Sequence, residues 1–222
     1  MVRTVLAGVA LGAALSIRAQ AQVSEVSEAS ATSLPRRWEF GAWAGGGPSV
    51  VTASLGGVPN RALFLTTVSV TRPLVRVKRF ACSYFAEVVP FAIATKVPKT
   101  VGSWFYNPSH TDSLYFVGPA GAGAVLGTGI VPLGLRLSAS LGSSLLGYAE
   151  ANGGVVAFSR AVPSGEARRM NFLGGVGAGV RFGGKDRRYS LGYRFLHLSN
   201  ANTAPENPGF NAHVFYVGIM LR

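Results

Sequence analysis

Charge is scarce in this sequence, and acidic charge is the scarcest. Charged residues make up 14% of the 222 residues, against roughly 25% in an ordinary soluble domain. Only 9 residues are acidic whereas 21 are Lys or Arg, so the formal net charge is +12. The basic residues are scattered and form no single run or helical stripe. This spread argues against nucleic acid as the partner.

Cysteine and long apolar runs are also nearly absent. The single cysteine, Cys82, excludes an internal disulfide and is interpreted as a small apolar strand residue. The apolar run at residues 4–17 is shorter than the about 20 residues that a spanning helix needs. It follows Arg3 and precedes a small-residue site at Ala21, which is the order of a cleaved secretory signal peptide. We expect the mature chain to begin at Gln22, outside the cytoplasm; an uncleaved anchor is the alternative.

The remaining sequence predicts one domain. Residues 22–36 are rich in Ser, Glu and Ala without apolar periodicity, which predicts a flexible leader after the signal peptide of residues 1–21. Residues 37–222 show no internal repeat or low-complexity tract and are predicted to form a single domain.

What the sequence does contain is apolar and glycine-rich. Hydrophobic residues reach 48%, and there are 29 glycines, which suit close strand packing. In lipid, only helices and closed barrels satisfy every backbone polar group, so an apolar chain without an apolar helix indicates a membrane β-barrel. The basic residues would then meet lipid phosphates. The runner-up architecture is a soluble sandwich or lipocalin-like barrel, but its strands should have one distinctly polar face, whereas here both faces are largely apolar or small.

Eight segments have strand chemistry and are separated by turn-forming residues. They are residues 38–45, 62–77, 80–95, 114–126, 131–146, 170–182, 189–199 and 212–221. The predicted fold is therefore all-β, an eight-stranded antiparallel outer-membrane β-barrel with a long insert at residues 150–169. A barrel of this size is filled by side chains, which disfavours a passive pore.

The seventh predicted strand brings a histidine and a serine together. If both termini lie in the periplasm, this strand ends at the extracellular side near Ser199. Because side chains alternate, Tyr193, Phe195, His197 and Ser199 share one face, which we expect to face lipid. A histidine can take the proton of a serine hydroxyl and make it a nucleophile. The alternative for so short a motif is a solvated polar pair without a role.

The residues that follow this pair extend the pattern. The sequence reads His197-Leu198-Ser199-Asn200-Ala201, then Asn207-Pro208-Gly209-Phe210-Asn211 and a closing strand. This order resembles the C-terminal signature of the PagL family and its acyloxyacyl hydrolase relatives. Members of that family are outer-membrane serine esterases that remove an ester-linked acyl chain from lipid A. The resemblance implies lipopolysaccharide as the partner and the outer membrane of a Gram-negative bacterium as the location, with the site facing the outer leaflet.

The resemblance also implies roles for single residues. Ser199 is the nucleophile and His197 the general base. Oxyanion or substrate-binding groups are expected at Asn200, Ala201, Asn202 and Asn207.

The acid of the family aligns with Asn211, which can orient an imidazole but brings no full charge. Glu206, in the same loop, is the candidate substitute. A catalytically impaired barrel that binds lipopolysaccharide or has a structural envelope role therefore stays open as the alternative, and so does a homodimer.

Neither a metal nor a cofactor is predicted. His213 lies on the closing strand and could meet His197, but two histidines without a neighbouring Cys or Asp are a weak ligand set. His110 is interpreted as a loop residue. No glycine-rich stretch has phosphate-loop or dinucleotide spacing.

Overall fold

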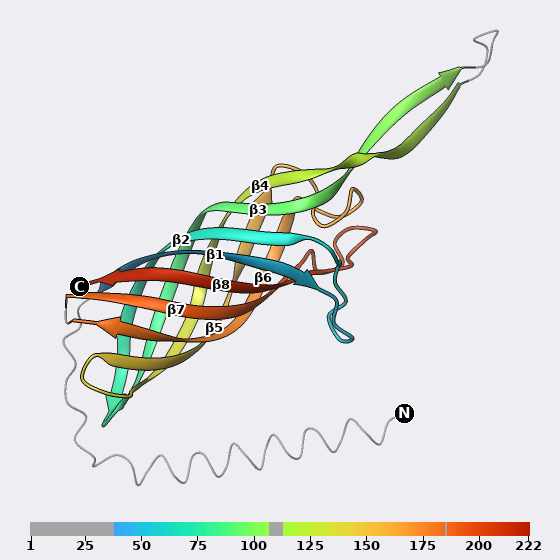
Figure 1. Ribbon diagram of the computed structural model, residues 1–222. Coiled ribbons are helices and arrows are strands. Elements are labelled where there is room, and N and C mark those ends of the chain that lie inside the picture. The colour runs from blue at the N-terminus through green and yellow to red at the C-terminus, as the bar shows by residue number, and fades with distance from the viewer. Residues whose placement is uncertain (1–37, 107–112, 185) are drawn as a thin grey trace, which may run out of the picture.

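A computed structural model describes the backbone of residues 38–106, 113–184 and 186–222, and their side chains except at 99–120. Eight antiparallel strands close into a barrel in chain order, with the first strand paired to the last (Figure 1). They are β1 (Glu39–Val50), β2 (Ala62–Val77), β3 (Phe80–Tyr106), β4 (Ser113–Ser140), β5 (Leu145–Phe158), β6 (Met170–Gly183), β7 (Arg187–Ser199) and β8 (Phe210–Leu221). The predicted fold class is confirmed. The predicted signal peptide and leader lie outside the described residues.

Two of the predicted strands were assigned to the wrong residues. The single strand β4 covers predicted strand 114–126 and most of 131–146. It also runs through the gap between them, where the sequence pattern indicates turn-forming glycines at residues 127 and 129. The fifth strand, β5, instead takes up much of the predicted insert at residues 150–169. The number of strands is right, but this part of the chain pairs differently.

The glycines at residues 127–129 explain the error. A Cβ atom on Gly127 would lie 2.6 Å from the Phe158 ring, and one on Gly129 would lie 2.4 Å from the Val155 carbonyl oxygen. These glycines therefore let β4 and β5 approach each other closely inside a continuous strand. In the sequence, the same residues look like a turn.

The two ends of the barrel differ. The short connections at residues 78–79, 141–144 and 184–186 lie at the end where β1 begins and β8 ends (Figure 1). The longer connections at residues 51–61, 159–169 and 200–209 lie at the opposite end, beyond which β3 and β4 continue as a two-stranded ribbon. We call these the terminal end and the loop end.

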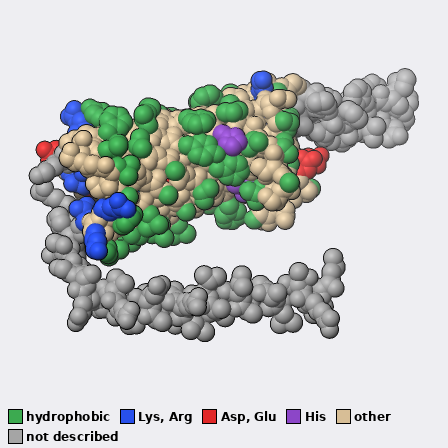
Figure 2. Space-filling view, turned by 60° about the horizontal axis from the view of Figure 1, so that its bottom comes forward, with side chains coloured by type: hydrophobic (Ala, Val, Ile, Leu, Met, Phe, Trp, Pro, Cys, Tyr) green, Lys and Arg blue, Asp and Glu red, His purple; other side chains and the backbone are tan. Residues whose placement is uncertain are grey.

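The outer wall is apolar. Large hydrophobic side chains are more than half exposed on several strands, among them Phe91 at 63%, Leu133 at 68% and Phe215 at 62%. Figure 2 shows this apolar cover along the barrel, with Lys and Arg gathered mainly at one end. Such a surface is that of a barrel whose wall contacts lipid. Among the described residues, no helix is long and apolar enough to cross a membrane.

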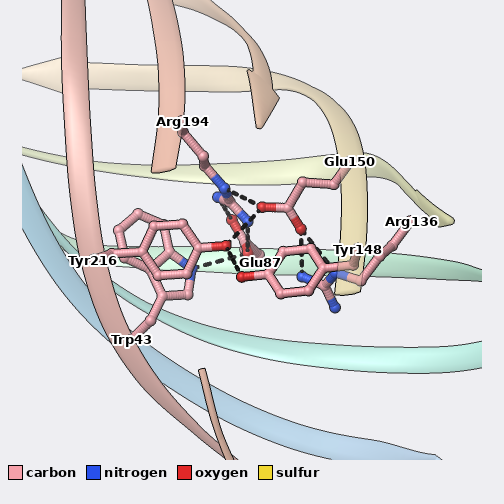
Figure 3. Close-up of polar contacts among 7 residues, drawn as sticks. All are labelled: Trp43, Glu87, Arg136, Tyr148, Glu150, Arg194 and Tyr216. Carbon is pink, nitrogen blue, oxygen red and sulfur yellow. Dashed lines mark hydrogen bonds and ion pairs between the residues drawn. The ribbon is translucent and has the colours of Figure 1, made fainter. Parts of the chain in front are cut away.

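The middle of the lumen is filled by a buried ionic network (Figure 3). The Arg194 guanidinium donates to both carboxylate oxygens of Glu87 at 2.7 and 2.8 Å and to Glu150 at 2.7 Å. Arg136 donates to the other oxygen of Glu150, and the Tyr216 hydroxyl donates to Glu150 at 3.0 Å. Such pairing offsets the free-energy cost of burying these charges. The packed lumen argues against a passive pore.

Candidate functional site

His197 and Ser199 lie at the loop end of β7, on the outer wall. Their neighbours Leu196 and Leu198 are each 1% exposed and face the lumen, whereas His197 and Ser199 are half-buried. Strand β8 places Asn211 directly opposite His197 in the antiparallel register. The alternation of side chains along β7 predicted this outward orientation, and the structure agrees with it.

The imidazole of His197 is held by Asn211. Its Nδ1 atom lies 2.6 Å from Asn211 Oδ1. The Asn211 Nδ2 group donates to the carbonyl oxygen of Gly56 at 2.7 Å and to Thr52 Oγ1 at 3.3 Å. Asn211 is completely buried. The carbonyl of Gly56 can only accept a hydrogen bond, so it orients the amide with Oδ1 toward the histidine.

This orientation sets the tautomer of His197. Asn211 Oδ1 is only an acceptor, so the 2.6 Å contact requires the proton of the neutral imidazole to be on Nδ1. The Nε2 atom is then left with its lone pair, which is the form that a general base needs.

The β1–β2 connection covers this pair of side chains. The backbone N–H of Gly57 donates to the Pro208 carbonyl oxygen at 2.7 Å. Gly56 and Gly57 have φ values of 63° and 130°, which favour glycine. A Cβ atom on Gly57 would also lie 2.8 Å from Asn211 Nδ2. In the sequence, this glycine pair lies between the predicted strands 38–45 and 62–77, and nothing there indicates the contact between Gly56 and Asn211, which are 155 residues apart.

The Ser199 hydroxyl contacts the β7–β8 connection, where it donates a hydrogen bond to Asn207 Oδ1 at 3.1 Å. Asn207 Nδ2 is 3.0 Å from Ser199 Oγ, and the Ala201 N–H donates to the same oxygen at 3.1 Å. Asn202 accepts a second bond from Asn207 Nδ2 at 2.9 Å. Between the described side chains of Ser199 and His197 there is no direct hydrogen bond.

A tight turn at residues 200–203 positions the backbone N–H of Ala201. Ala201 and Asn202 have φ values of 53° and 60°, and the Thr203 N–H donates to the Asn200 carbonyl oxygen at 3.2 Å. Two successive left-handed residues closed by such a bond make a type I′ turn. The turn directs the Ala201 N–H back toward Ser199.

Two predicted site residues are turned away from this centre. Asn200 is 1% exposed, and its Nδ2 group donates to the Glu206 carbonyl oxygen at 2.7 Å, so its side chain braces the loop from inside instead of forming an oxyanion contact. The Glu206 carboxylate is exposed and accepts a hydrogen bond from Ser164 in the β5–β6 connection. The structure therefore pairs His197 with Asn211 and not with Glu206.

His213, the other histidine among the described residues, is not brought to the site. His213 Nδ1 lies 2.7 Å from the Tyr193 hydroxyl, and its ring stacks on Tyr193. His110 lies outside the described residues. In the part of the chain that the structure describes, no three His, Cys, Asp or Glu side chains are grouped so as to hold a metal ion.

The wall beside His197 has a strip without side chains. Gly174 of β6 lies opposite His197, and Gly153 of β5 lies opposite Gly174. A Cβ atom on Gly174 would meet no described atom within 4 Å. On β6 this strip is flanked by Phe172 and Val176, which are 50% and 59% exposed. An extended apolar chain can therefore lie against the wall next to the imidazole.

A comparison with known families matches residues 96–220 to a family model described as lipid A 3-O-deacylase (PagL). No curated protein matches the chain. One similar solved structure is the outer membrane enzyme PagL, with 16% identity, coverage of 83% of this chain and 99% of that chain, and a TM-score of 0.48. Neisserial surface protein A (NspA) has 13% identity, coverage of 83% of this chain and 96% of that chain, and a TM-score of 0.45. Ail, the attachment invasion locus protein of Yersinia pestis, has 8% identity, coverage of 84% of this chain and 98% of that chain, and a TM-score of 0.39.

Proposed function

This chain belongs to the lipid A 3-O-deacylase (PagL) family, and on that premise we propose that it is an outer-membrane serine esterase that removes an ester-linked acyl chain from lipid A. The observation that carries the proposal is the 2.6 Å bond between His197 and Asn211, two residues from Ser199 on the lipid-facing wall. It leaves the Nε2 atom with a free lone pair, on the same outward face of β7 as the Ser199 hydroxyl.

The first half of the reaction acylates the enzyme. His197 Nε2 takes the proton of the Ser199 hydroxyl while Ser199 Oγ attacks the ester carbonyl carbon of the lipid. The tetrahedral intermediate collapses, the acyl chain stays on Ser199 Oγ, and the protonated imidazole returns its proton to the departing sugar oxygen. In the second half, His197 Nε2 takes a proton from a water molecule, whose oxygen attacks the acyl carbon. The bond to Ser199 Oγ breaks, the imidazole returns the proton to that oxygen, and the fatty acid is released.

The negative oxygen of the intermediate needs donors. The Ala201 N–H and Asn207 Nδ2 groups lie 3.1 and 3.0 Å from Ser199 Oγ, so a carbonyl oxygen bound next to Oγ comes within their reach. One such donor typically contributes about 2.7 to 4 kcal/mol to the transition state. Asn211 keeps the imidazole in the required tautomer, as an asparagine does in papain-like proteases.

The substrate class follows from the position of the site. Ser199 opens to the apolar outer wall, so an ester that lies within a lipid layer reaches it without leaving that layer. With the terminal end in the periplasm, as is usual for bacterial barrels, the loop end faces the outer leaflet, where lipid A resides. The acyl chain would lie along the strip at Gly174 and Gly153.

A second candidate function is a family-like barrel that binds lipopolysaccharide without hydrolysing it. The observation in its favour is that the partner of His197 is an amide, which cannot stabilise the imidazolium with a full charge.

One experiment distinguishes the two. Purified lipid A is incubated with the parent, Ser199→Ala and His197→Ala, and the products are analysed by mass spectrometry. Ser190→Ala, on the same strand but near the terminal end, is the matched control. Fatty-acid release by the parent and the control alone supports the esterase. Equal release from all four proteins would refute it, and lipid A binding without release from any of them would favour the second candidate.

A further inference from the structure

A second concave site lies at the terminal end of the barrel, remote from Ser199. It is a cavity of about 510 Å³ that is lined in part by the turns at residues 78–79 and 141–144. Among the residues that the structure describes, six basic side chains and one acidic side chain, Glu39, line it. The six are Arg76, Lys78, Arg79, Arg181, Arg188 and Arg222. Figure 2 shows Lys and Arg gathered at this end. We call this cavity the basic mouth.

The acidic residue is already matched. Arg222 Nε lies 2.5 Å from Glu39 Oε1. For the other five basic side chains, no ion pair is formed with any carboxylate among the residues that the structure describes. The basic mouth therefore concentrates positive charge that the described residues do not neutralise.

Arg181 is the residue that most needs a partner. It is 8% exposed, and its Nε atom has no hydrogen-bond acceptor among the described residues. Its guanidinium only stacks over the Tyr148 ring, with 5.2 Å to the centroid. In the same lumen, Arg194 is paired with two carboxylates. An unpaired buried charge is costly, so a ligand that enters the basic mouth and accepts hydrogen bonds from Arg181 would offset that cost.

The uncharged lining suggests what kind of ligand this is. Five serines line the mouth: Ser83, Ser138, Ser140, Ser143 and Ser144. Hydroxyl donors beside several guanidinium groups suit an anion with many oxygens and more than one charge. The cavity volume suits a small group and excludes a folded macromolecule. We propose that the basic mouth binds a phosphate-bearing anion, supplied either by a phospholipid headgroup or by a free phosphate compound.

The test uses the full barrel, purified in an uncharged detergent. In one arm, inorganic pyrophosphate is titrated into the protein by calorimetry. In the other arm, short-chain phosphatidylglycerol is compared with short-chain phosphatidylcholine, whose headgroup has no net charge. Each arm includes Arg181→Gln and the control Arg169→Gln, an exposed arginine of the β5–β6 connection at the loop end.

We expect saturable binding of at least one anionic probe, weakened about tenfold or more by Arg181→Gln and unchanged by Arg169→Gln. Binding of pyrophosphate alone assigns a free phosphate as the source, and binding of phosphatidylglycerol alone assigns a headgroup. Added salt should weaken either.

Arg181→Gln should fold, because it removes an unpaired buried charge. If it does not fold, the double variant Arg76→Gln, Arg188→Gln replaces it, since both side chains lie at the more open rim. No binding of either probe, or equal binding by the parent and the folded mouth variant, would overturn the proposal.

Discussion

The Oδ1 atom of Asn211 faces the Nδ1 atom of His197 at 2.6 Å because the other end of the same amide is bound by the Gly56 carbonyl. A carboxylate at this position would have no N–H to offer to Gly56. The loop end therefore accommodates an amide at this position, with both ends of the side chain hydrogen-bonded.

Asn211→Ala should therefore lower the rate of deacylation without unfolding the barrel. The imidazole loses the bond that selects its tautomer, and loss of tautomer control in a serine hydrolase lowers kcat by up to about 10⁴-fold. Steady-state release of fatty acid from lipid A measures this. An unchanged kcat would mean that Asn211 does not position His197.

Asn211→Asp tests the same contact from the other side. One carboxylate oxygen would face the Gly56 carbonyl oxygen, so a hydrogen bond is replaced by repulsion. We expect the loop end to lose about 1 to 3 kcal/mol of stability. The rate of backbone amide hydrogen exchange in the β1–β2 connection should be higher in Asn211→Asp than in the parent, whereas the rates elsewhere in the barrel should be unchanged. A variant as protected as the parent would contradict this account.

Gly57→Ala should disturb the site more than the barrel. Gly57 has a φ of 130°, and an added Cβ atom would lie 2.4 Å from the Val50 carbonyl oxygen. Such a strained residue costs about 1 to 3 kcal/mol locally. Deacylation should fall while thermal unfolding of the barrel stays almost unchanged. The matched control is Gly142→Ala in the β4–β5 turn, where an added Cβ atom meets no described atom within 4 Å.

Gly174→Leu should obstruct the acyl chain. The new side chain would fill the strip beside His197, where the structure has room for it. We expect kcat/KM to fall by roughly 10- to 200-fold, the range for a hydrophobic site altered by a small group. Ala178→Leu, on the same face of β6 but farther from His197, is the control and should be nearly neutral. Equal effects of both would argue that the acyl chain does not lie along Gly174.

Glu87→Ala should destabilise the whole barrel. It leaves the guanidinium of Arg194, which is 2% exposed, without two of its hydrogen bonds (Figure 3). Breaking a buried ion pair by removing one partner costs about 3 to 5 kcal/mol. Unfolding by urea in detergent measures the loss. The double variant Glu87→Ala, Arg194→Met should recover part of it, and a double variant less stable than the single one would contradict the pairing.

The local sequence pattern was sufficient to predict the bounds of strands whose residues are regularly strand-forming. The segment at residues 62–77 has the same bounds in the sequence prediction and in the structure, and residues 170–182 differ by one residue. The pattern failed at residues 127–129, because a glycine that permits close packing of strands and a glycine that makes a turn are identical in sequence. Only the contact with β5 distinguishes them.

The candidate site also has one part that the sequence predicted and one part that only the tertiary structure revealed. Alternation along β7 was enough to place His197 and Ser199 on one outward face, since a strand repeats every two residues. The partner of His197 depended on the closure of the barrel and on the β1–β2 connection, which is about 150 residues away in sequence.

By itself, the sequence determined the class of fold, the number of strands and the outward His-Ser pair, because these follow from composition and from a repeat of two residues. Only the tertiary structure decided that Asn211 and not Glu206 meets the imidazole, and that Arg181 lies unpaired in a basic cavity. Both outcomes depend on groups that are far apart in sequence: the Gly56 carbonyl orients the Asn211 amide, and Glu39 pairs with Arg222 and not with Arg181.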